Sequence, residues 1–331
     1  MFCIELTSHC NFSCVYCPMR WMTRKKQHIN YQTAVRSLKD IAGHKLDSTV
    51  GFHVMGEPML YPRFDKVLAY AKTLGLKTIL VTNGSLLTPE RTKKIVPRLD
   101  HIIISVNGNS PAMHALRGGK MSFDTYSRRI QTAVCLLLEK KISVTLSYMT
   151  GSLTKQKFIC TRNEEETVVQ EWLRRTRLMP KIPSAKEKSR TDFIKTLQNE
   201  TGGRCLTLPC GLNILFRPVS PLWAGESVTG KQSPPADPSR RCTFTPSVLS
   251  SGQFVLCCGD FDGRMSIGNA STMPVHEILK QNRLLIKKIA SLNDRGLLFE
   301  RACTGCSPRT SPRRITSSTE NEQKPNKTKP Q

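Results

Sequence analysis

Acidic residues are scarce in this chain of 331 residues, since 25 Asp and Glu stand against 50 Lys and Arg. The formal charge of +25 favours an acidic partner, such as nucleic acid, a phosphorylated substrate or an acidic peptide. Aromatic residues are also scarce, at 6%, and no strand shows the stacking aromatics of RNA-binding sheets. The charge alone therefore gives only weak support to a nucleic-acid partner.

Long apolar runs are missing as well. No segment approaches the length of a membrane span, and the start Met1-Phe2-Cys3 lacks the basic and apolar regions of a secretion signal. The hydrophobic content of 38% is ordinary for a globular protein. We therefore expect a cytoplasmic protein with no membrane contact, long enough to hold more than one domain.

Cysteine, by contrast, is abundant. The chain has 13 cysteines, an odd number that cannot all pair. In a reducing compartment, closely spaced cysteines bind metal more often than they form disulfides. Seven of them fall into two spaced groups, and we expect the other six to be small buried side chains. These six are Cys3, Cys135, Cys160, Cys205, Cys210 and Cys258.

The first group has the spacing CxxxCxxC and consists of Cys10, Cys14 and Cys17. A structural zinc ion takes four protein ligands. A four-iron cluster held by only three thiolates keeps one iron open for a substrate or cofactor. The spacing therefore favours an iron–sulfur cluster, and the alternative is a zinc knuckle completed by His9 or His28.

Apolar strands alternate with helical periodicity through the first two thirds of the chain. Polar and glycine motifs follow the strands, where the active sites of α/β barrels assemble. Six strands joined by helices predict parallel βαβ units and an α/β fold, a partial (β/α)6 TIM-like barrel. The strands are expected at 2–6, 49–55, 77–81, 101–106, 142–148 and 212–216, and the helices at 31–42, 64–74, 89–96, 126–138 and 164–178.

The cysteine spacing on the loop after the first strand, with Tyr16 just before the last cysteine, resembles the radical S-adenosylmethionine (radical SAM) superfamily. The resemblance covers about residues 2–225. It implies that Cys10, Cys14 and Cys17 hold a [4Fe–4S] cluster whose open iron binds S-adenosylmethionine (SAM). It also implies hydrogen-atom abstraction from a substrate and a low-potential electron donor such as a flavodoxin or a ferredoxin.

A second motif, Met55-Gly56-Glu57-Pro58, resembles the family's GGEP motif, with methionine in place of the first glycine. The resemblance implies that the Glu57 carboxylate accepts hydrogen bonds from the SAM ammonium group. Gly56 would allow a close approach of the backbone. The alternative is an ordinary turn at the end of a strand.

Four further residues lie where the family lines its SAM pocket: Tyr16, Asn83, Ser105 and Asn107. By the resemblance, Ser105 or Asn107 would reach the ribose hydroxyl groups. Each of the strand-end residues has an alternative role as a helix cap or turn residue.

The second cysteine group consists of Cys242, Cys257, Cys303 and Cys306. The string Cys257-Cys258-Gly259-Asp260 resembles the CCxD string of the SPASM/twitch extension of radical SAM enzymes, which implies one auxiliary [4Fe–4S] cluster held by the four cysteines. A short β-hairpin strand is expected at 253–256, just before Cys257, and a helix near 275–289. Adjacent strand residues point to opposite faces, so only one of Cys257 and Cys258 is expected to be a ligand. The alternative is a zinc ribbon. The spacing of Cys205 and Cys210 fits neither pattern.

These observations predict a core domain at 1–225 with an insertion at 179–210, a small α+β iron–sulfur domain at 226–306 and a disordered tail at 307–331. The expected function is reductive cleavage of SAM and hydrogen abstraction from a small molecule or peptide, in a dehydrogenation or related oxidation assisted by the auxiliary cluster. The alternatives are a peptide- or RNA-modifying radical SAM enzyme and a non-catalytic metal- or RNA-binding protein. Because the first strand begins at residue 2, we expect no N-terminal leader-binding domain, which counts against the peptide alternative.

Overall fold

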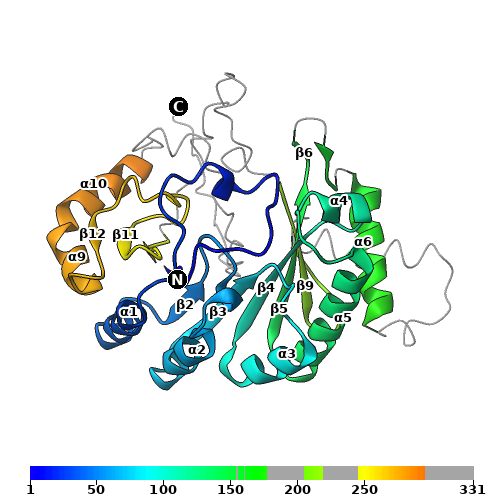
Figure 1. Ribbon diagram of the computed structural model, residues 1–331, viewed down its shortest axis with the longest axis horizontal. Coiled ribbons are helices and arrows are strands. Elements are labelled where there is room, and N and C mark those ends of the chain that lie inside the picture. The colour runs from blue at the N-terminus through cyan, green and yellow to red at the C-terminus, as the bar shows by residue number, and fades with distance from the viewer. Residues whose placement is uncertain (154–155, 160, 177–204, 219–244, 295–331) are drawn as a thin grey trace, which may run out of the picture.

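A ten-stranded sheet with the order β12-β11-β10-β1-β2-β3-β4-β5-β9-β8 forms the centre of the molecule (Figure 1). The computed structural model describes residues 1–153, 156–159, 161–176, 205–218 and 245–294. The six central strands run parallel to one another and confirm the predicted α/β fold and partial barrel. They are β1 (Phe2–Ile4), β2 (Thr49–Phe52), β3 (Lys77–Thr82), β4 (His101–Asn107), β5 (Ser143–Thr150) and β9 (Leu212–Pro218).

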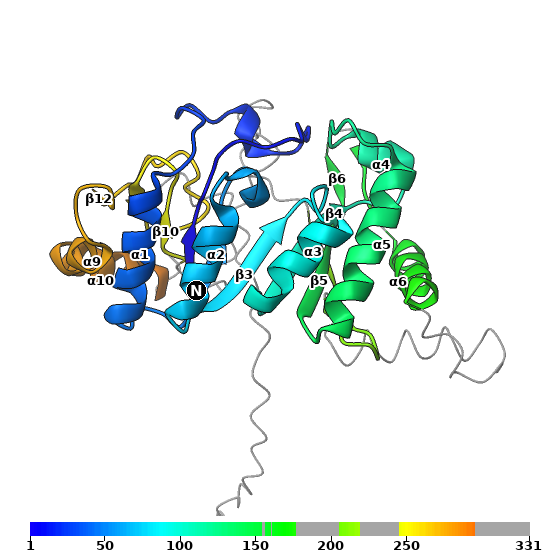
Figure 2. The same cartoon turned by 60° about the horizontal axis from the view of Figure 1, so that its bottom comes forward.

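Helices connect these strands and cover the outer side of the sheet (Figures 1 and 2). All five predicted helices are present, with small shifts at their ends. They are α1 (Tyr31–Gly43), α2 (Phe64–Thr73), α3 (Pro89–Ile95), α5 (Phe123–Glu139) and α6 (Arg162–Arg175). Their starts follow from capping residues: Asn30 accepts hydrogen bonds from two amides of α1, and Thr161 and Glu164 form a capping box on α6.

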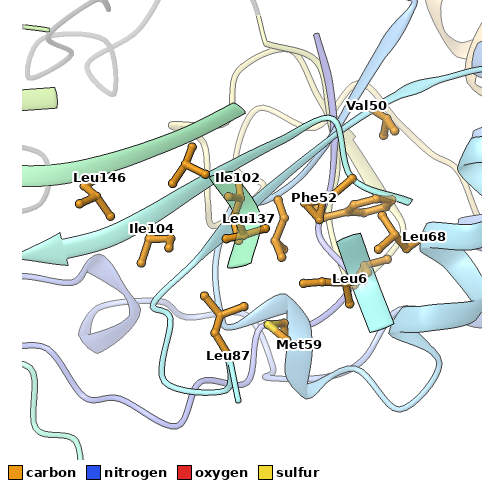
Figure 3. Close-up of a cluster of buried hydrophobic side chains, with 14 of the residues drawn as sticks. Leu6, Val50, Phe52, Met59, Leu68, Leu87, Ile102, Ile104, Leu137 and Leu146 are labelled. Carbon is orange, nitrogen blue, oxygen red and sulfur yellow. The ribbon is translucent and has the colours of Figure 1, made fainter. Parts of the chain in front are cut away.

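The main hydrophobic core lies between the sheet and these helices (Figure 3). Even-numbered strand residues such as Phe52, Ile102 and Leu146 are fully buried there, together with Leu68 of α2 and Leu137 of α5. Burial of each such side chain contributes about 1.5–3 kcal/mol. Because side chains alternate along a strand, the odd-numbered residues face the inner side of the barrel.

Three further strands extend the same sheet on the other side of β1: β10 (Ser247–Val248), β11 (Gln253–Val255) and β12 (Gly268–Asn269). β10 is parallel to β1, and the hairpin from β10 to β11 turns at Gly252, whose φ of +87° is favourable only for glycine. The strand predicted before Cys257 is therefore confirmed as β11.

The prediction of a single helix near 275–289 is wrong. Two helices are present instead, α9 (Val275–Gln281) and α10 (Arg283–Asp294). The break falls at Asn282, whose side-chain amide donates hydrogen bonds to the carbonyls of Ile267 and Ile278. An asparagine that bonds to backbone in this way competes with helix continuation.

Several elements gave no signal in the sequence: α4 (Pro111–Ala115), the small hairpin of β6 (Ser152–Leu153) and β7 (Gln156–Lys157), and β8 (Cys205–Thr207). β8 pairs antiparallel with β9, so the end of the predicted insertion at 179–210 is regular. The described residues do not include 179–204 of that insertion, the boundary near 226 or the tail at 307–331. They also leave out Cys160, Cys242, Cys303 and Cys306. None of the described helices is long and apolar enough to cross a membrane.

Candidate active site

The first cysteine group lies on the loop after β1, which we call the cysteine loop (residues 9–17). Backbone hydrogen bonds fix this loop at both ends. The amide of Glu57 donates to the His9 carbonyl at 2.8 Å. The amides of Ser13 and Val15 donate to the carbonyls of Arg117 and Leu116, just after α4, at 3.0 and 2.9 Å. The loop is therefore held over the carboxyl ends of the parallel strands, the edge at which the sequence predicted the site.

Cys10, Cys14 and Cys17 are all partly exposed, and the Cys17 amide donates to the Cys14 carbonyl at 3.0 Å. Burial raises the pKa of Cys10 to about 11, with further increases from the charges of Glu57 and Cys14. Burial also raises the pKa of Cys17 to about 12, and the charges of Cys14 and Cys10 add to it. The three cysteines that the sequence singled out therefore lie on one loop at the carboxyl edge of the sheet.

Glu57 is fully buried, and burial raises the pKa of its carboxyl group. One carboxylate oxygen accepts hydrogen bonds from the Thr82 hydroxyl at 2.7 Å and the Met59 amide at 3.2 Å. The other accepts from the Asn83 amide at 2.7 Å. Glu57 thus joins the turn after β2 to the end of β3, a role that the motif resemblance did not indicate.

Gly56 approaches the cysteine loop closely. Its φ is +73°, and an added Cβ would lie 2.3 Å from the carbonyl oxygen of Thr7 and 2.6 Å from that of His9. The predicted close backbone approach at Gly56 is therefore to the cysteine loop itself.

This contact predicts that Gly56→Ala destabilises the protein by more than about 1 kcal/mol, because both the backbone conformation and the space exclude a side chain. Denaturant unfolding measures the change. Gly43→Ala in the last turn of α1 is the matched control, since nothing lies within 4 Å of its added Cβ. An equal loss of stability in both variants would contradict the close approach.

Asn83 extends from β3 to the cysteine loop. Its side-chain amide donates to Asn11 Oδ1 at 2.9 Å and to Cys10 Sγ at 3.7 Å, and its Oδ1 accepts from the Ser85 amide. The Phe12 amide also donates to Cys10 Sγ at 3.4 Å. Hydrogen bonds of this kind orient a sulfur ligand and tune its electron density.

Tyr16 of the cysteine loop contacts Asn107 at the end of β4. The Asn107 side-chain amide donates to the Tyr16 hydroxyl at 3.1 Å, and the Tyr16 ring packs edge-on against Phe158 with centroids 5.5 Å apart. Burial raises the pKa of Tyr16, so its hydroxyl is protonated at neutral pH. Asn107 is buried with a φ of +63°, and its Oδ1 has no hydrogen-bond partner among the described residues.

Ser105 lies two residues before Asn107, on the inner side of the barrel. Its register partner on β5 is Ser147, whose buried hydroxyl also lacks a partner within the described ranges. Buried polar atoms are almost always paired. The unpartnered oxygen atoms of Asn107 and Ser147 therefore mark this end of β4 and β5 as a place where a polar ligand would complete the hydrogen bonding.

Arg117, which the sequence analysis missed, connects the parts of this site. It is 1% exposed, and its guanidinium donates to the carbonyls of Asn83, Ser105 and Val106 at 3.1, 2.8 and 3.2 Å. The same group lies over the ring of Phe12, 4.5 Å from its centroid. The only signal in the sequence was an arginine followed by Gly118-Gly119, which alone indicates nothing more than a turn.

Cys257 is the described member of the second cysteine group. Its Sγ accepts a hydrogen bond from the Gly259 amide at 3.2 Å, whereas Cys258 packs against an apolar cluster that includes Met55. The turn that follows is tied to the segment after the cysteine loop, because the Asp262 carboxylate accepts from the Thr23 amide at 2.8 Å. The described part of the second group thus lies against the segment that follows the first.

A family model described as the Radical SAM superfamily matches residues 4–152. Residues 4–152 are a radical SAM domain. An uncharacterised protein of Methanocaldococcus jannaschii is 34% identical over 133 residues, covering 39% of this chain and 42% of that protein. An S-adenosylmethionine-dependent nucleotide dehydratase of Pseudoalteromonas ulvae is 33% identical over 116 residues, covering 30% of this chain and 38% of the relative. This radical SAM chain therefore spans less than half the length of both curated relatives.

The fold agrees with this assignment. Streptococcus suis SuiB, solved with its precursor peptide SuiA, superposes with a TM-score of 0.57 at 13% identity, over 88% of this chain and 66% of that one. The radical SAM family implies a [4Fe–4S] cluster and SAM. The residues present fit both groups, since three cysteines lie on one loop at this edge and Asn107 Oδ1, which has no partner among the described residues, can accept a hydrogen bond from a ligand hydroxyl.

Proposed function

We propose that this radical SAM protein is an enzyme that binds a [4Fe–4S] cluster through Cys10, Cys14 and Cys17 and cleaves SAM reductively. When bound, such a cluster supplies the electron that splits the SAM sulfonium and yields a 5′-deoxyadenosyl radical able to abstract hydrogen from a substrate. The observation that carries the proposal is the position of the three cysteines on one loop that backbone hydrogen bonds hold over the carboxyl ends of the strands.

The surrounding residues have distinct parts in this proposal. The amide groups of Asn83 and Phe12 hold and polarise the Cys10 sulfur. The Glu57 carboxylate can accept more hydrogen bonds than the three that it already receives. We propose that it accepts a hydrogen bond from the SAM ammonium group. We assign Asn107 Oδ1 and the Ser105 hydroxyl to the SAM ribose. The Tyr16 hydroxyl orients Asn107, because it accepts a hydrogen bond from the Asn107 side-chain amide.

Polar side chains on the inner side of the barrel favour a substrate that carries hydroxyl groups. Beside Ser105 of β4, its register partner Ser147 on β5 has a buried hydroxyl with no hydrogen-bond partner among the described residues. We propose that the substrate is a small organic molecule with a hydroxyl group that binds the Ser147 hydroxyl. The net reaction is an oxidation such as alcohol dehydrogenation, in which the substrate loses two electrons and two protons in total.

We further propose one auxiliary [4Fe–4S] cluster with Cys257 as a ligand, which would serve as acceptor for the second substrate electron. Its other expected ligands, Cys242, Cys303 and Cys306, lie outside the described residues. Cys257 is favoured over Cys258 because a backbone amide already donates to its sulfur, while Cys258 packs among apolar side chains. The electron for SAM cleavage would come from a low-potential donor such as a flavodoxin or a ferredoxin.

This ligand assignment predicts that Cys257→Ser lowers the iron content of the reconstituted protein by about half, because one of two four-iron clusters is lost. Cys258→Ser is the matched control and should keep its full iron content. Iron and sulfide are counted per chain after anaerobic reconstitution. If Cys258→Ser loses the iron and Cys257→Ser keeps it, the assignment of the two residues is reversed.

The proposed function is tested by adding dithionite and SAM to the iron-loaded protein and measuring 5′-deoxyadenosine by chromatography. We expect about eight irons per chain and deoxyadenosine formed in an amount that rises with protein concentration. Zinc in place of iron, or no deoxyadenosine from fully loaded protein, would contradict the proposal.

A further inference from the structure

A cluster of Asp40, His44 and His276 lies away from the cysteine loop, where α1 contacts α9 (Figures 1 and 2). One ligand atom from each of the three residues lies within 4.8 Å of the other two. Asp40 Oδ1 is 2.5 Å from His276 Nδ1 and 3.5 Å from His44 Nε2. The two imidazole rings are stacked, with centroids 3.6 Å apart.

We propose that this cluster is a binding site for a divalent transition-metal ion of the zinc class. Two imidazoles and one carboxylate are a common donor set for Zn²⁺, with water in the fourth position. The Asp40 side chain is 8% exposed and is already held in place, because its Oδ2 accepts a hydrogen bond from the His276 amide at 2.7 Å. The carboxylate ligand is therefore fixed before the ion arrives.

A second carboxylate supports the assignment. Glu277 Oε1 lies within ion-pair distance of His276 Nε2, at 3.3 Å, and of Lys280 Nζ, at 3.7 Å. Histidine ligands usually donate their other ring N–H group to a carboxylate, which fixes the tautomer and makes the ligating nitrogen more basic. With the proton on Nε2, Nδ1 of His276 is free to bind the ion.

Binding requires two local changes. The ion replaces the direct contact between His276 Nδ1 and Asp40 Oδ1, and any proton held on Nδ1 leaves to solvent. The His44 ring turns out of the stack, because two parallel rings cannot direct their lone pairs at one ion. The His44 side chain is 50% exposed, immediately after α1, and so has the room to turn.

The consequence is a cross-link between distant parts of the chain. Asp40 and His276 are 236 positions apart, on a helix of the barrel and a helix of the C-terminal part. An ion bound by both would stabilise the contact of α1 with α9 without taking part in chemistry at the cysteine loop. The inference is therefore independent of the proposed function.

The test uses the full-length, iron-loaded protein, to which Co²⁺ and, in a separate experiment, Zn²⁺ is added. We expect one equivalent of zinc per chain beyond any bound to thiols, and Co²⁺ bands in the visible range without thiolate charge transfer. Asp40→Asn and His44→Gln should weaken this binding by about 10- to 100-fold. His101→Gln is the matched control, because His101 lies on β4 and its Nε2 is 2.9 Å from the hydroxyl of Thr145, away from the cluster.

A second experiment measures the effect of zinc on thermal stability. Zinc should raise the midpoint of thermal unfolding of the wild-type protein by a few degrees, ~4 °C, and should leave that of His44→Gln unchanged. Uptake that is equal in His44→Gln and wild type, or Co²⁺ spectra that show thiolate ligation only, would overturn the proposal. In that case the cluster is only a hydrogen-bonded contact between the two helices.

Discussion

Replacement of Cys14 by serine is expected to reduce deoxyadenosine formation to the level measured without protein. Cys14 is the middle ligand of the proposed cluster, and its charge contributes to the raised pKa values of both Cys10 and Cys17. Loss of one of three thiolates leaves a site with two protein ligands, too few to hold the cluster with a single open iron. The measurement is deoxyadenosine per chain after identical reconstitution.

The control for this substitution is Cys135→Ser on α5, which lies on the outer helical layer (Figure 2). This variant should cleave SAM as the wild type does. If Cys14→Ser retains cleavage, the first cysteine group is not the cluster site and the proposed function is wrong. Circular dichroism of both variants shows that each remains folded.

Replacement of Arg117 by methionine is expected to lower the free energy of unfolding by about 3–5 kcal/mol, because the carbonyl oxygens of Ser105 and Val106 lose this donor and that of Asn83 keeps the Tyr126 hydroxyl in its place. Methionine retains much of the side-chain volume, so the change reports on the hydrogen bonds rather than on a cavity. Since those carbonyls belong to Asn83, Ser105 and Val106, the loss should also disturb the assigned SAM pocket.

Arg128→Met is the control for Arg117, because Arg128 is exposed on α5. Its effect on the free energy of unfolding should stay within about 0.5 kcal/mol. Denaturant unfolding measures both variants, and titration with SAM reports the pocket. Equal stability of Arg117→Met and wild type would contradict the central role of this guanidinium in the site.

The sequence predicted most of the barrel because each strand and helix carries its own local signal. The apolar runs of β3 and β4, the helical spacing in α2 and the asparagine cap of α1 are all readable within a few residues. The three thiols were predictable for the same reason, since their spacing lies within eight residues of one loop.

Contacts between distant segments could not be predicted in this way. Arg117 bonds to the ends of β3 and β4, and Asp262 bonds to Thr23, 239 positions away. The hydrogen bonds that end α9 at Asn282 also depend on Ile267, a residue outside the helix. No periodicity encodes such partners, because they are chosen by the folded arrangement of the strands and helices.

In the proposed function, the first cysteine group holds a cluster with one open iron that binds SAM. The most direct test is electron–nuclear double resonance of the dithionite-reduced protein with SAM isotopically labelled at its amino nitrogen. We expect a hyperfine coupling from the label to the reduced cluster, and none in Cys14→Ser. A reduced cluster whose spectrum is unchanged by SAM, with no coupling from the label, would contradict the claim.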